Sequence, residues 1–144
     1  MPQSGVGEPK AGVADCLIDT NVASYMLRGD TRATAYRAYL NGKRAAVSFM
    51  TIAEMRHWAL GRNWGVQRRR ELEEFLSQFT VCFVDDALWT AWATIVDKRF
   101  RDGKPIDTAD AWVAAPAWLL SIPLVTHNIR HFAGIAGLQV ISFS

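Results

Sequence analysis

The sequence predicts an α/β domain built around a five-stranded parallel sheet. Short apolar stretches rich in strand-forming residues recur along the 144 residues, and segments with helical periodicity lie between them. The apolar stretches do not alternate with polar residues, which is typical of strands buried on both faces. Strands that alternate with helices favour a parallel sheet with right-handed crossover connections.

Five segments are expected to form the strands, and each ends near a polar or turn-forming residue. They are residues 13–18, 45–49, 81–84, 123–126 and 138–142. Residues 1–12 are rich in Gly and Pro without periodicity and predict a flexible leader. The folded domain is therefore expected to span residues 13–144.

Helix signals fill the intervals between these strands. One helix is expected to start near Asn21, and another from Thr51 to about Leu60, where Thr51 and Glu54 match the capping-box pattern T-x-x-E. Apolar residues recur every three or four positions in the longer segments, and the last long helix begins at Asp107 or Thr108. The remaining predicted helices are residues 31–40, 66–79 and 86–101.

Composition excludes several classes of protein. Hydrophobic residues make up 50% of the chain, which is too apolar for intrinsic disorder. The longest apolar run covers residues 111–120, whereas a membrane span needs roughly 18 residues or more. Cys16 and Cys82 are too few and too far apart for a disulfide framework or a metal-binding motif, so a cytoplasmic protein without a membrane segment is expected.

Acidic and polar residues stand where the predicted strands end. Asp19 follows the first strand directly, Glu54 lies one turn into the helix after the second, and Asp110 lies in the first turn of the helix before the fourth. Thr126 and Asn128 follow the fourth strand. Because ligands bind beyond the carboxyl ends of parallel strands, these side chains are expected to converge on one crevice.

Each of these residues also has a purely structural interpretation. Asp19 suits the N-cap of the helix that follows it, and Glu54 suits the second half of a capping box. Asp110 complements the dipole at a helix N-terminus, and Asn128 is a common turn residue. Their placement at the same edge of the sheet favours the functional interpretation.

A cluster of carboxylates favours a hard divalent cation. Carboxylates repel one another, and Mg²⁺ binds oxygen ligands, usually one or two carboxylates together with substrate phosphate. Such an ion activates water for hydrolysis of a phosphodiester. The chain contains no G-x-x-x-x-G-K-[ST] and no G-x-G-x-x-G, so nucleotide binding of those types is disfavoured.

Four segments in a fixed order carry a family resemblance. They are LIDTNV (17–22), SFMTIAEMR (48–56), GKPIDTADAWVAA (103–115) and LVTHNIRHFAGIAGLQVI (124–141). Together they resemble PIN-domain ribonucleases, and specifically the VapC-type toxin of VapBC toxin–antitoxin systems. The resemblance implies a three-layer α/β/α fold with a five-stranded parallel sheet, and cleavage of single-stranded regions of structured RNA such as tRNA or rRNA. It also implies a VapB-like antitoxin and a homodimer.

The resemblance also implies roles for individual residues. Asp19, Glu54 and Asp110 match the acidic triad that holds Mg²⁺ or Mn²⁺, with Asp19 and Asp110 as the metal ligands. Asn128 occupies a fourth position that is often Asp in the wider family. The polar positions that support the acids match Thr20, Asn21 and Thr126.

Two departures from the family pattern keep alternatives open. Pro116 stands inside the helix that carries Asp110, where a kink downstream of the catalytic turn is expected. Together with the uncharged Asn128, it motivates a non-catalytic or solitary PIN-like module that binds an antitoxin or RNA. A haloacid-dehalogenase-like phosphatase is disfavoured because Asn21 stands where that family needs a second Asp. His127 and His131 flank Asn128, where contact with phosphate is one interpretation and an incidental loop position is the favoured one.

Overall fold

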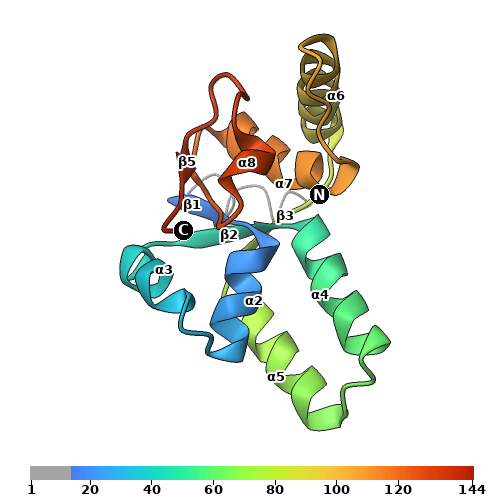
Figure 1. The fold of residues 1–144 in the computed structure, drawn as a ribbon. Helices are drawn as coiled ribbons and strands as arrows, with labels where there is room; N and C mark the ends of the chain where they lie inside the picture. Colours follow the sequence, from blue (N-terminus) through green and yellow to red (C-terminus); the bar gives the residue numbers. More distant parts are fainter. Residues whose placement is uncertain (1–13) are drawn as a thin grey trace.

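The computed structural model describes residues 14–144, in which a parallel sheet lies between two layers of helices (Figure 1). All strand pairs are parallel, and the spatial order is β3-β2-β1-β4-β5. The predicted α/β/α class with a five-stranded parallel sheet is confirmed. The strands are β1 (Cys16–Ile18), β2 (Ala45–Ser48), β3 (Thr80–Cys82), β4 (Leu124–Val125) and β5 (Val140–Ile141).

Helices cover both faces of the sheet. In Figure 1, α2 to α5 lie on one side of the strands and α6 to α8 on the other. The helices of the described residues are α2 (Thr20–Arg28), α3 (Ala33–Leu40), α4 (Phe49–Gly61), α5 (Val66–Leu76), α6 (Asp86–Arg101), α7 (Thr108–Leu120) and α8 (Ile129–Phe132).

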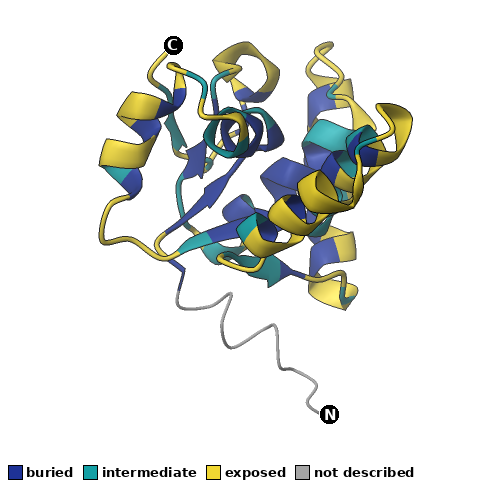
Figure 2. Cartoon of the chain, turned by 90° about the horizontal axis from the view of Figure 1, so that it is seen from below, coloured by how far each residue is buried: buried dark blue, intermediate teal, exposed yellow. Residues whose placement is uncertain are grey.

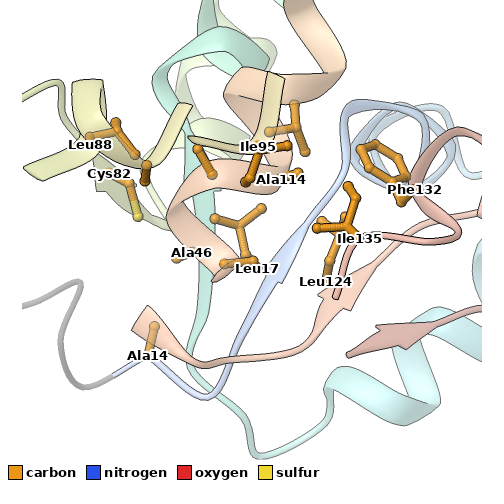
Figure 3. Close-up of a cluster of buried hydrophobic side chains, with 14 residues drawn as sticks. Ala14, Leu17, Ala46, Cys82, Leu88, Ile95, Ala114, Leu124, Phe132 and Ile135 are labelled. Atoms are coloured by element: carbon orange, nitrogen blue, oxygen red, sulfur yellow. The ribbon is translucent and has the colours of Figure 1, made fainter. Parts of the chain in front are cut away.

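Two separate cores follow from the alternation of side chains along β1. Cys16 and Ile18 point to the face covered by α2 to α5, whereas Leu17 points to the face covered by α6 to α8. Figure 3 shows Leu17 among side chains that include Ile95 and Ala114 on this second face. All three residues of β1 are completely buried, as expected for the central strand of a three-layer domain.

The burial pattern matches this arrangement. In Figure 2 the central strands are mostly buried, the edge strands β3 and β5 are largely intermediate, and the outward faces of the helices are exposed. Within residues 14–144, no helix combines the length and the apolar character that a membrane span requires.

Two predicted elements end two or three residues earlier than expected. The third strand ends at Cys82 rather than Val84, because Cys82 pairs with the last residue of β2 and no strand continues beside the next two residues. Phe83 and Val84 are accordingly exposed. The helix predicted to reach residue 79 ends at Leu76, where the chain turns toward β3.

The predicted capping box is also wrong. Helix α4 begins at Phe49, one residue after β2, and the Ser48 hydroxyl caps it by accepting a hydrogen bond from the Met50 N–H. Thr51 lies inside the helix. Helix α8 was not predicted, because four residues are too short to show periodicity. The predicted leader and Val13 lie outside the described residues.

Helix α7 continues through its proline. It runs from Thr108 to Leu120 with Pro116 in its interior, so the proline does not end the helix. Asp110 keeps the predicted place in the first turn.

Candidate active site

The centre of the candidate site is the point where β1 and β4 end side by side. Leu17 pairs with Leu124 and Ile18 with Val125, so Asp19 and Thr126 emerge next to each other. The Thr126 hydroxyl donates a hydrogen bond of 2.7 Å to Asp19 Oδ2. Residues 107 positions apart in sequence thus meet through the register of two parallel strands.

Asp19 is both a helix cap and a buried carboxylate. Its Oδ1 accepts from the Thr20 N–H at 2.7 Å, which confirms the capping role, while Oδ2 remains directed to Thr126. Only 6% of the residue is exposed. The ion pairs within residues 14–144 do not include Asp19.

Burial raises the pKa of Asp19 from 3.8 to about 6. The hydrogen bonds from Thr126 and Thr20 oppose this rise in pKa, whereas the negative charges of Asp110 and Glu54 add to it. The three carboxylates therefore lie close enough to act on one another electrostatically, as their predicted convergence requires.

Glu54 is joined to the same corner by a threonine. Its Oε1 accepts a hydrogen bond of 2.7 Å from the Thr20 hydroxyl, which also lies 2.8 Å from the hydroxyl of Thr51. Thr20 is the neighbour of Asp19 in sequence, so the first turn of α2 fixes the side chain that α4 contributes. The interpretation of Glu54 as half of a capping box is wrong, because Ser48 caps this helix.

Asp110 is more accessible than Asp19 and has a histidine neighbour. Its side chain is 22% exposed, and Oδ2 lies 2.9 Å from His131 Nδ1. Partial burial raises the pKa of Asp110, and the nearby Asp107 and Glu54 charges add to the rise, whereas His131 opposes it. The sequence favours an incidental role for His131 and carries no signal for helix α8, yet this helix places His131 against Asp110.

The loop after β4 is bound to the site by its backbone and by its asparagine. The Asn128 N–H donates to the Thr126 hydroxyl at 3.0 Å, and the Asn128 amide nitrogen lies 3.4 Å from His131 Nδ1. Asn21 Oδ1 accepts from the His127 N–H at 3.4 Å. All seven sequence-predicted site residues thus lie at one edge of the sheet, where Asn21 and Asn128 hold the loop that carries Thr126.

A second group behind this loop was missed entirely. The buried Tyr36 hydroxyl lies 2.7 Å from His127 Nδ1 and accepts from the Phe143 N–H at 3.1 Å. No local pattern marks this contact, because it joins α3, the β4 loop and the chain after β5.

The donors of the site fit a hard divalent cation better than zinc. No three Asp, Glu, His or Cys side chains of residues 14–144 form a ready set of metal ligands. Mg²⁺ needs only one or two carboxylates, because water and substrate phosphate complete its shell. Asp19, whose charge is buried without a cationic partner among the described ion pairs, and Asp110 supply two oxygen donors of this type.

Comparison with known proteins places this chain in a family. The family model for the PIN domain matches residues 16–138. Ribonuclease VapC1 of Haemophilus influenzae (strain R2866) is 30% identical over 128 residues, which cover 85% of this chain and 93% of that protein. The tRNA(fMet)-specific endonuclease VapC of Shigella flexneri is 25% identical, with 89% and 97% covered.

Solved structures agree with the fold. VapBC-1 from nontypeable Haemophilus influenzae superposes with a TM-score of 0.76 and 27% identity, covering 88% of this chain and 96% of that one. VapBC2 from Rickettsia felis gives a TM-score of 0.79 at 20% identity, covering 90% and 98%, and supports the fold alone. The matched family model and the VapC relative together show that the chain belongs to the PIN-domain family and, within it, to the VapC ribonucleases.

Proposed function

We propose that this protein is a metal-dependent endoribonuclease that acts as the toxin of a toxin–antitoxin pair. The observation that carries the proposal is the buried Asp19 carboxylate, held by Thr20 and Thr126 beside two further acids. A buried carboxylate without a cationic partner is unfavourable for folding, and a site that retains one is a candidate for function.

Asp19 and Asp110 are the proposed ligands of Mg²⁺, with Mn²⁺ as a substitute. When bound, the cation neutralises their charges and supplies an activated water and charge stabilisation at the scissile phosphate. Thr126 and the Thr20 N–H orient Asp19 so that its carboxylate does not rotate. Glu54 has one oxygen bound to Thr20, and its other oxygen is available to orient the attacking water and accept a proton.

An aromatic rim beside the β4 loop, next to an arginine that is also paired with Asp30, supports RNA as the substrate. The Arg32 guanidinium lies 4.0 Å from the ring centroid of Tyr25, and the Tyr25 ring meets the His127 ring edge-on at 5.3 Å. Aromatic rings and arginines together bind unstacked bases and phosphates of single-stranded RNA. The rim adjoins the loop that holds Asn128, so single-stranded RNA bound to the rim extends toward the three acids.

The partners follow from the relatives. Several solved relatives are VapBC complexes, which supports a VapB-like antitoxin that binds this chain and blocks its activity. A homodimer stays a prediction. Co-expression with a VapB-like antitoxin, followed by light scattering, measures both the complex and its stoichiometry.

Cleavage of total cellular RNA tests the activity. Purified, antitoxin-free protein is incubated with Mg²⁺, with Mn²⁺ or with EDTA, beside the Asp19→Asn variant. Discrete fragments that require the metal and are absent with Asp19→Asn support the proposal, and mapping of their 5′ ends identifies the RNA. A well-folded protein that cleaves with neither metal would favour the non-catalytic binding module, for which Asn128 would be the first residue to examine.

A further inference from the structure

The Trp112 carbonyl of helix α7 receives its hydrogen bond from outside the helix. In an α-helix the N–H four residues later donates to each carbonyl, but that position is Pro116, which has no N–H. The Ser48 hydroxyl donates to the Trp112 carbonyl instead, at 2.7 Å. Pro116 therefore leaves the Trp112 carbonyl without its usual donor within the helix. The Ser48 hydroxyl, which lies outside α7, donates the hydrogen bond instead.

Ser48 uses both hydrogen-bonding capacities of its hydroxyl at the junction of β2 and α4. The oxygen accepts a hydrogen bond from the Met50 N–H at 3.1 Å and so caps α4. The O–H donates to the Trp112 carbonyl in α7. The residue is completely buried, so water does not compete for either bond. The Phe49 and Trp112 rings also meet, with centroids 5.3 Å apart.

The two helices joined here are those that carry two of the acids. Trp112 lies two residues after Asp110 on α7, and Ser48 precedes the first turn of the helix that carries Glu54. We propose that Ser48 is a positioning residue for the proposed reaction: its bond to the Trp112 carbonyl sets the placement of the Glu54 helix against the Asp110 helix. Pro116 has no N–H to compete for the Trp112 carbonyl, so this carbonyl stays available to the Ser48 hydroxyl.

A four-protein cycle separates this positioning role from stability. The proteins are the wild type, Ser48→Ala, Pro116→Ala and the double variant. Ser48→Ala is expected to lower the urea midpoint by about 1 M, because the Trp112 carbonyl is left unpaired and the cap is lost. In the Pro116→Ala background the loss is about half as large, because the new N–H of residue 116 pairs with the carbonyl.

Activity is expected to respond differently from stability. Ser48→Ala lowers kcat by about tenfold with KM nearly unchanged, and the same loss persists in the double variant, because neither protein retains the bond between the helices. Ser48→Thr keeps the hydroxyl and retains most of kcat. Recovery of kcat together with stability in the double variant would show that Ser48 acts through stability alone, and would overturn the proposal.

Asp85→Ala is the matched control. Asp85 caps α6 through a 2.8 Å bond from the Leu88 N–H, and none of its hydrogen bonds within residues 14–144 joins two helices. Its replacement is expected to lower the urea midpoint equally with Pro or Ala at residue 116 and to leave kcat unchanged. An equal midpoint loss for Ser48→Ala in both backgrounds would mean that Ser48 is only a cap, and would also overturn the proposal.

The proposal rests on the proposed function, and one measurement distinguishes the two. If the wild type cleaves no RNA, the proposed function fails, and amide hydrogen exchange then decides the positioning role. Exchange of the hydrogen-bonded amides of α7 from residue 111 to residue 115 is expected to rise by about tenfold in both proteins that carry Ser48→Ala. Unchanged exchange there would contradict the bond between the helices whatever the RNA result.

Discussion

Asp19 and Asp110 carry the same chemical group in opposite surroundings. Asp19 is 6% exposed, with one hydrogen bond on each oxygen and no place in the described ion pairs. The Asp110 side chain is 22% exposed and lies 2.9 Å from a histidine. The strand-end carboxylate is held in one orientation by neutral donors, whereas the helix carboxylate is more exposed and lies against a histidine.

The different surroundings of Asp19 and Asp110 indicate different roles for the two carboxylates. Neutral donors fix the geometry of Asp19 without cancelling its charge, so the charge remains for a ligand. Burial, which these donors offset only in part, raises the pKa of this carboxylate to about 6. Asp110 is partly screened by water, so its surroundings affect stability less.

The largest expected effect is on cleavage, where the two acids should behave alike. Asp19→Asn and Asp110→Asn are each expected to reduce single-turnover cleavage by about a thousandfold, because both act in one unit. The double variant should be little worse than either single variant. Fully additive losses would show that the two carboxylates act in separate steps.

Stability should separate the two acids. The pKa of Asp19 is raised in the folded state, so the folded protein binds more protons between pH 4 and pH 6, and stability falls as the pH rises through this range. Asp19→Asn removes that slope, and in EDTA at pH 7 it is expected to stabilise the fold by up to about 3 kcal/mol.

Urea unfolding of both Asn variants from pH 4 to pH 8 measures the difference. Asp110→Asn is expected to change the free energy of unfolding by less than about 1 kcal/mol, because solvent screens its charge. If the free energy of unfolding of the wild type does not change between pH 4 and pH 6, the burial of the Asp19 charge is not unfavourable, and the prediction is refuted.

Replacement of Thr126 tests whether the neutral donor is essential. Thr126→Val removes the hydrogen bond that most strongly lowers the pKa of Asp19, so this pKa should rise further and cleavage at pH 7 should fall by about tenfold. Thr126→Ser keeps the donor and is the control. The loss of cleavage caused by Thr126→Val should be smaller at pH 8. An equal loss of cleavage at pH 7 and pH 8 would show that the variant acts through altered packing and not through the pKa of Asp19.

The smallest effect is expected at the partner of Asp110. His131→Ala should lower cleavage by no more than about fivefold, because the pair is partly exposed and such pairs contribute little. His131→Gln retains a donor and should lie closer to the wild type. A loss at His131 as large as that at Thr126 would show that the two carboxylates are supported equally strongly.

The residues that were predicted correctly are those next to strand ends. Asp19 and Thr126 directly follow apolar strands, and the carboxyl ends of parallel strands share an edge, so their meeting follows from the pattern. Asp110 was placed correctly in the first turn of its helix because Gly103 and Pro105 end the previous one.

The residues that were missed depend on distances that no local pattern contains. Ser48 and Thr51 both suit a helix cap, and the end of β2 decides between them. His131 needed helix α8, whose four residues carry no period. Tyr36 and His127 are 91 positions apart, and only the packed layers bring them together.

The pairing of β1 with β4 has a consequence for synthesis of the protein. Asp19 is made early, but the strand beside it and the threonine that orients it are separated from it by more than 100 residues. A nascent chain that has not reached β4 lacks half of the support for its first acid, and pairing between such distant segments is slow. During synthesis the active site is therefore assembled only when the chain is nearly complete, so the ribosome that makes this nuclease meets the assembled site late.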